Sequence, residues 1–193
     1  MEIEPVFCCD HDWKANACLN FSDDPIHLYA KGYKEAGDLL VEYVLVAENE
    51  QDTLIYPIVF LYRQYIELRL KEIIREGRIL LEEGNDFPKH HKIFDLWCLA
   101  KKIILKSFDN EEESPDLKYA EHVIREFSQI DPDSFSFRYP TTKNGDKTLD
   151  GVLHINIRRL ATHVEALSKD LESISIGISV YRDWQKEMWS SCY

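Results

Sequence analysis

The sequence lacks the short motifs that mark the commonest enzyme classes. It contains no Gly-rich phosphate loop, no G-x-S-x-G elbow, no H-E-x-x-H and no C-x-x-C pair. Three of its five cysteines lie near the start, at Cys8, Cys9 and Cys18, but adjacent cysteines rarely hold one ion well. We therefore expect no metal and no cofactor, and a metal site in this N-terminal segment is the open alternative.

Long apolar runs and an excess of positive charge are also missing. No run approaches the roughly 18 to 20 apolar residues that span a bilayer, and the acidic opening at residues 1–4 does not resemble a signal peptide. The formal net charge of -12 argues against a protein whose whole surface attracts nucleic acid or an anionic membrane, but it leaves a local basic site open. With an odd number of cysteines, these features predict a cytoplasmic protein without a membrane partner.

The most apolar long segment, residues 55–75, is the predicted central helix. At helical spacing its apolar side chains cover most of its girth, so several other elements must contact it. Arg63, Glu67 and Lys71 lie four residues apart along one edge, where they can pair in series. This row is either a salt bridge at the boundary of the core or a polar site inside a helical bundle.

Four further helices are predicted, giving a single helical domain over residues 23–193. Each follows a polar or proline-containing start and carries apolar residues three and four apart. The starts are Ser22–Pro25, Lys89–Lys92, Ser114–Asp116 and the residues after Gly151; Pro57 is expected in the first turn of the central helix, and residues 109–113 as an acidic loop. Residues 1–22 show no period, and Trp13 and Phe21 indicate a segment that docks on the domain.

A small β ribbon is predicted near residues 134–150. Phe135, Phe137 and Tyr139 alternate with polar residues, as in an extended segment, and Asn144-Gly145 is a good hairpin turn. The expected fold class is therefore an all-α bundle of about five helices that carries this ribbon.

The last helix is predicted to carry a long apolar seam with heptad spacing. The seam consists of Ile157, Leu160, Val164, Leu167, Leu171, Ile174, Ile178 and Tyr181. Because a seam of this length exceeds what one small bundle usually covers, it is a candidate interface for a homodimer as well as a core element.

Three segments together resemble bacterial proteins with a HEPN-like helical fold. They are Tyr62–Lys71, His91 with Phe94–Trp97, and Asp131–Asp133 leading to Phe137–Pro140; the resemblance covers roughly residues 25 to 190. It implies a compact bundle of four or five helices that commonly dimerises. Many such proteins are metal-independent ribonucleases of toxin–antitoxin or antiphage systems, and others only bind nucleotides or protein partners.

The resemblance implies a candidate catalytic pair, because active HEPN ribonucleases carry an Arg followed, after four to six residues, by a His. Arg158 and His163 match this spacing, and Arg159 lies four residues from His163 on one helical face. The arginine would steady charge on the scissile phosphate, and the histidine would act as acid or base for attack by the ribose 2′-OH. The alternative is a solvated basic helical turn.

A second candidate site consists of residues from the segments that carry the resemblance. Arg63, Glu67, His91, Asp131 and Arg138 could gather into a polar pocket that holds a phosphate of RNA or a nucleotide through its arginines. The alternative is structural, with ion pairs that tie the ribbon to the bundle.

Two functional hypotheses follow. The first is an effector of a bacterial defence or toxin–antitoxin system that acts on RNA or a nucleotide. The second is a non-catalytic dimeric interaction module, such as an antitoxin, immunity or scaffold subunit, with a protein partner in the same system. A basic, His-containing cleft at a dimer seam would favour the first, and a broad acidic or apolar patch without such a cleft would favour the second.

Overall fold

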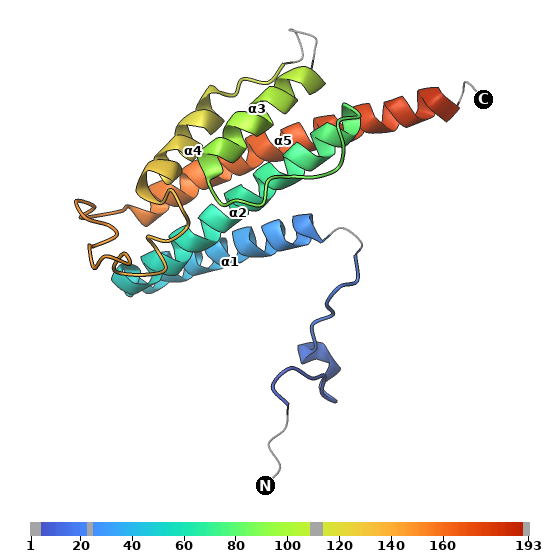
Figure 1. Cartoon of the computed structure of the whole chain (residues 1–193). Helices are drawn as coiled ribbons and strands as arrows, with labels where there is room; N and C mark the ends of the chain where they lie inside the picture. The colour runs from blue at the N-terminus through green and yellow to red at the C-terminus, as the bar shows by residue number, and fades with distance from the viewer. Residues whose placement is uncertain (1–4, 23–24, 109–113, 191–193) are drawn as a thin grey trace.

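Five α-helices make up the fold in the residues that this computed structural model describes, namely 5–22, 25–108 and 114–190. They are α1 (Ile26–Ala47), α2 (Gln51–Leu80), α3 (Ile93–Ser107), α4 (Lys118–Ile130) and α5 (Ile157–Ser190) (Figure 1). The predicted all-α bundle of five helices is thus confirmed. The predicted acidic opening at 1–4, the capping residues 23–24 and the acidic loop 109–113 lie outside the described residues.

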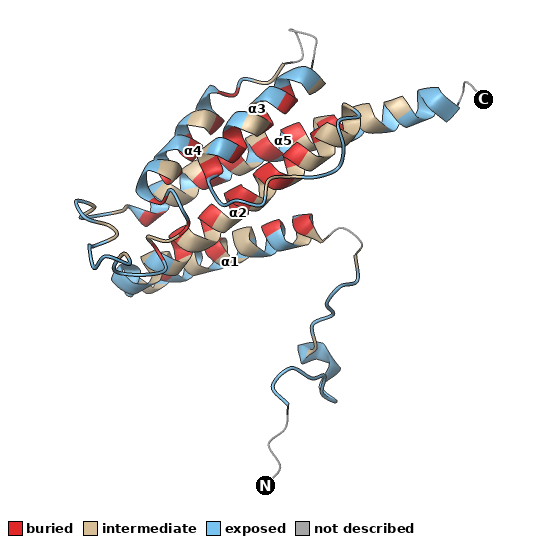
Figure 2. Cartoon of the chain, in the orientation of Figure 1, coloured by how far each residue is buried: buried red, intermediate tan, exposed pale blue. Residues whose placement is uncertain are grey.

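The central position of α2 is confirmed by its neighbours. It packs against α1, α3 and α5, and Figure 2 shows buried residues along its length. The helix begins at Gln51. Pro57 therefore lies in its second turn, whereas the sequence predicted it in the first turn. The helix tolerates this proline because the carbonyl that it leaves unpaired belongs to the exposed residue Thr53.

The segment between α4 and α5 forms no β ribbon, so that prediction is wrong. Among the described residues its strand-like pairing is limited to one isolated bridge between Thr141 and Lys147. Asp131 Oδ1 accepts the backbone N–H of Phe135 at 2.7 Å, and the Tyr139 N–H donates to the Phe135 carbonyl at 3.2 Å. These bonds coil the chain, so Phe135 and Tyr139 stack at 4.6 Å on one side of a turn.

The heptad seam of α5 faces the chain's own core. Six of its eight residues are buried, from Ile157 to Ile178, and α5 contacts α1, α2 and α4. The helix begins later than the Gly151 signal indicated, because Asn156 Oδ1 accepts the Arg159 N–H at 2.9 Å and caps the first turn. Beyond the core, the C-terminal end of α5 projects past the other helices (Figure 1).

The N-terminal segment 5–22 leads away from α1 (Figure 1). Its large apolar side chains are all exposed: Val6, Phe7, Trp13, Leu19 and Phe21. Its role as a docking segment stays a prediction. In the part of the chain that the structure describes, no helix has the length and apolarity needed to cross a membrane.

Candidate functional site

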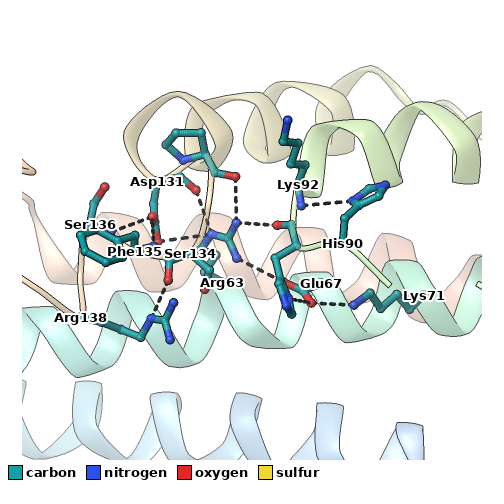
Figure 3. A network of polar contacts seen from close by, with 12 residues as sticks. Arg63, Glu67, Lys71, His90, Lys92, Asp131, Ser134, Phe135, Ser136 and Arg138 are labelled. Carbon is teal, nitrogen blue, oxygen red and sulfur yellow. Dashed lines mark hydrogen bonds and ion pairs between the residues drawn. The ribbon is translucent and has the colours of Figure 1, made fainter. Parts of the chain in front are cut away.

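The fold brings the predicted constellation on α2 together around the buried guanidinium of Arg63 (Figure 3). Its Nε donates to the Asp131 carbonyl at 2.9 Å, and its Nη2 donates to the carbonyls of His91 at 2.8 Å and Pro132 at 3.2 Å. Nη1 donates to Glu67 Oε2 at 3.3 Å. Arg63 therefore joins α2 to the segments that enter α3 and leave α4.

Glu67, one turn along α2, is equally buried and has three polar neighbours. Besides Arg63, Lys71 Nζ donates to its Oε1 at 2.8 Å, and the Nδ1 atom of His91 lies 2.8 Å from the same oxygen. Burial alone would raise the pKa of the Glu67 carboxyl, but the hydrogen bonds from Lys71 and His91 outweigh it and hold that pKa below its usual value. The carboxylate is therefore held in its charged form by its neighbours.

Asp131 and Arg138 complete the constellation in different ways. The Asp131 carboxylate is buried, lies 3.3 Å from Arg63 Nε and accepts two backbone N–H groups of the following turn, those of Phe135 and Ser136. Arg138 donates from Nε to the Ser134 carbonyl at 2.5 Å and is exposed. Arg138 is thus attached to the same turn but lies outside the buried ion pairs.

The geometry around Arg63 favours the structural interpretation of this cluster. Four hydrogen bonds already use its donors, and three of them go to backbone carbonyls that fix the ends of two loops. Burial lowers the pKa of the guanidinium, an effect that Asp131 and Glu67 oppose. A phosphate would have to displace these partners, so phosphate binding by Arg63, Glu67, His91 and Asp131 stays a prediction without geometric support.

The second predicted pair, Arg158 and His163, does not meet within one chain. Residues five apart on a helix point about 140° away from each other. Arg158 accordingly lines a hollow beside α1 with Asp38 and Glu165, whereas His163 lines a cleft beside α4. Their cooperation across a dimer interface stays a prediction.

The cleft that contains His163 lies between α4 and the start of α5 and has a volume of about 420 Å³. Its wall includes apolar side chains from α2, α4 and the loop before α5. Its polar members are His122, Glu126, Asn156, Arg159 and His163. The cleft therefore combines two imidazoles, one guanidinium, one carboxylate and one amide around an apolar floor.

A neighbouring side chain holds the ring of His163 in place. The Tyr119 hydroxyl lies 2.8 Å from His163 Nδ1, and the two rings stack with their centroids 6.1 Å apart. Because this hydrogen bond occupies Nδ1, the other ring nitrogen, Nε2, is the atom left for chemistry.

The sequence singled out His163 with Arg158 as its partner and placed Arg159 only on the same helical face, and it did not indicate the residues of α4. His122 and Glu126 are exposed at a spacing of four, and they alternate with the buried residues Val123 and Phe127. That pattern marks only an ordinary amphipathic helix. The packing of α4 against α5, which no local pattern reveals, places His122 and His163 on the wall of one cleft.

The donor set of the cleft suits phosphate and proton transfer better than metal binding. Within the described residues, no group of three or more His, Cys, Asp or Glu is arranged to hold a metal ion. A guanidinium binds phosphate oxygens, and a pair of imidazoles can serve as base and acid.

Comparisons with protein-family models, with curated proteins and with solved structures found no match for this chain.

Proposed function

We propose that this protein is a HEPN-like effector of a bacterial defence or toxin–antitoxin system that cleaves RNA without a metal ion. The α4–α5 cleft would be its site. The observation that supports the proposal is the presence of His122, Arg159 and His163 in one cleft of about 420 Å³.

The chemistry needs only these side chains and the substrate. One imidazole takes the proton from a ribose 2′-OH as its oxygen forms a bond to the adjacent phosphorus. The bond from phosphorus to the 5′-oxygen breaks, and the other imidazole, in its protonated form, gives a proton to that oxygen. The products are a 2′,3′-cyclic phosphate and a 5′-hydroxyl end. Arg159 pairs with the non-bridging oxygens, where negative charge grows.

The test is cleavage of a labelled single-stranded RNA by purified protein in EDTA. We expect His163→Ala and His122→Ala each to lower the rate roughly 10²-fold or more, because each removes one proton-transfer group. Arg159→Ala should lower it as well. His27→Ala, which changes an exposed histidine of α1, is the matched control and should leave the rate unchanged.

Two neighbouring arginines distinguish the two possible sites. Arg158→Ala should retain activity if the cleft acts within one chain, because Arg158 points to the other side of α5. The opposite result, with activity lost in Arg158→Ala and kept in Arg159→Ala, would place the reaction at a dimer interface formed by Arg158 and His163. Absence of cleavage by the folded parent protein would refute the ribonuclease proposal.

A second candidate function, a dimeric interaction module, is favoured by the projecting end of α5. Val180, Trp184 and Met188 are exposed at a spacing of four along one side, and Trp189 is exposed beside them. Exposed aromatic and aliphatic side chains in a row are typical of interaction surfaces. Under this alternative, α5 would join two copies of the chain through this end, and a protein partner of the same system would bind the dimer.

A further inference from the structure

The loop and helix start that border the cleft carry a charge opposite to that of the whole chain. Residues 134–163 contain five Lys or Arg residues and two Asp or Glu residues, a net charge of +3, in a protein with a formal net charge of -12. The basic residues are Arg138, Lys143, Lys147, Arg158 and Arg159. A polyanion approaching this protein is therefore attracted to this segment and repelled by most of the remainder.

A further hollow, of about 620 Å³, is formed by this segment together with α2, and two exposed tyrosines line it, Tyr56 of α2 and Tyr139. Tyr56 is 47% exposed and Tyr139 is 50% exposed. Phe135 stacks against the Tyr139 ring at 4.6 Å, with 28° between the ring planes. The ring is thus held in place before any ligand arrives, which lowers the entropy lost on stacking.

Positive charge lies beside these rings. Arg138 and Lys147 line the same hollow. The Arg138 guanidinium lies 5.7 Å from the centroid of the Tyr139 ring and 5.8 Å from that of Phe60. Its Nε is bound to the Ser134 carbonyl, while its Nη atoms have no hydrogen-bond partner among the described residues. These atoms are available for a phosphate next to a stacked ring.

The tyrosine hollow, as we call it, adjoins the α4–α5 cleft. Phe137 lines both of them. A strand whose scissile phosphate lies at Arg159 would therefore have the tyrosine hollow beside it.

We propose that the tyrosine hollow binds single-stranded RNA, with an unpaired base on Tyr139 and a phosphate at Arg138 and Lys147. The inference rests on the proposed function, and it adds the class of substrate. Aromatic side chains stack on bases only when those bases are free of a duplex, and basic residues follow the backbone. Paired RNA offers no free base faces, so the hollow selects single strands.

The experiment measures fluorescence anisotropy of a labelled 12-nucleotide RNA with 2′-O-methyl riboses, which cannot be cleaved by attack of the 2′-OH. The same strand annealed to its complement is the second probe. We expect the single strand to bind the parent protein at least tenfold tighter than the duplex. Tyr139→Ala should weaken single-strand binding roughly tenfold, because it removes the ring on which one base stacks.

Two further variants separate stacking from other effects. Tyr139→Phe keeps the ring and should retain the affinity. Tyr43→Ala removes an exposed tyrosine of α1, far from the basic segment in sequence, and should also retain it. Equal losses in Tyr43→Ala and Tyr139→Ala, duplex binding as tight as single-strand binding, or no binding by the parent would each overturn the inference.

The outcomes for binding and cleavage can be told apart. If the parent cleaves natural RNA but Tyr139→Ala binds the uncleavable strand normally, the tyrosine hollow is refuted and the proposed function stands. If Tyr139→Ala loses binding while neither the parent nor any variant cleaves RNA, the hollow is a binding site and the ribonuclease proposal fails.

Discussion

The buried carboxylate of Glu67 has three side-chain partners that carry or can carry positive charge. Arg63, Lys71 and His91 all contact it, and its side chain is 1% exposed. Removing one partner of a buried ion pair leaves an uncompensated charge. We therefore expect this cluster to stabilise the folded protein and to make that stability depend on pH.

Glu67→Gln should lower the free energy of unfolding at pH 7 by about 3 kcal/mol, because Lys71 stays buried without its counter-ion and Arg63 keeps only Asp131. The pKa of Glu67 in the folded state lies below its usual value. The stability that the Glu67 carboxylate contributes is therefore complete above the usual glutamate pKa of about 4.3. It is lost as the pH falls through the lowered pKa that Glu67 has in the folded protein. Urea unfolding at pH 7 and at several values below pH 4.5 should show the difference between parent and variant narrowing in acid.

The control for this prediction is Glu35→Gln. Glu35 also pairs with a lysine four residues away, Lys31, at 3.6 Å, but both side chains are more than half exposed. Such a pair contributes about 0–1 kcal/mol. If the free energies of unfolding of Glu67→Gln and of the parent differ by the same amount at every pH, the charge of Glu67 is not the cause of the difference.

At the scale of elements, the contact between α1 and α2 depends on a close approach at one glycine. A Cβ atom built at Gly37 would lie 2.7 Å from Cε1 of Tyr62, a fully buried residue of α2. Gly37→Ala should therefore destabilise the protein by about 1–3 kcal/mol, because the Tyr62 ring has to move. Thermal or urea unfolding measures this cost.

Gly32 on the same helix is the matched comparison. A Cβ atom there would meet nothing within 4 Å, and alanine is the better helix former. Gly32→Ala should stabilise the protein by about 0.5–1 kcal/mol. Destabilisation of similar size by both substitutions would show that the α1–α2 contact is not the cause.

At the scale of the whole molecule, the exposed C-terminal end of α5 is the surface through which two copies of the chain are predicted to pair. If two copies pair through it, the parent should elute in size-exclusion chromatography with light scattering at twice the chain mass of 22.7 kDa. Trp184→Glu should shift the protein towards the monomer, because a charge would replace a buried aromatic side chain at the interface.

Leu39→Glu tests whether two copies pair through α1 instead, since Leu39 is an exposed apolar residue of that helix. It should leave the mass unchanged. A monomeric parent would refute the homodimer, and dissociation by Leu39→Glu alone would move the interface to α1.

The sequence by itself determined the five helices and the class of fold. Apolar periodicity in residues 55–75 identified the central helix, because a helix that is apolar over most of its girth has to be surrounded. The row of Arg63, Glu67 and Lys71 likewise predicted a series of ion pairs, because residues four apart on a helix are neighbours whatever surrounds them. These features depend on local spacing, which the chain carries before it folds.

Tertiary structure alone decided which distant residues meet. Alternating aromatics predicted a ribbon after Asp131, but the buried Asp131 carboxylate bonds to the next turn and coils it. The packing of α4 on α5 brought His122 into one cleft with His163. Arg158 points to another side of α5 than His163 and therefore lines a different hollow. Such neighbours depend on how helices pack, and one local pattern is compatible with many packings.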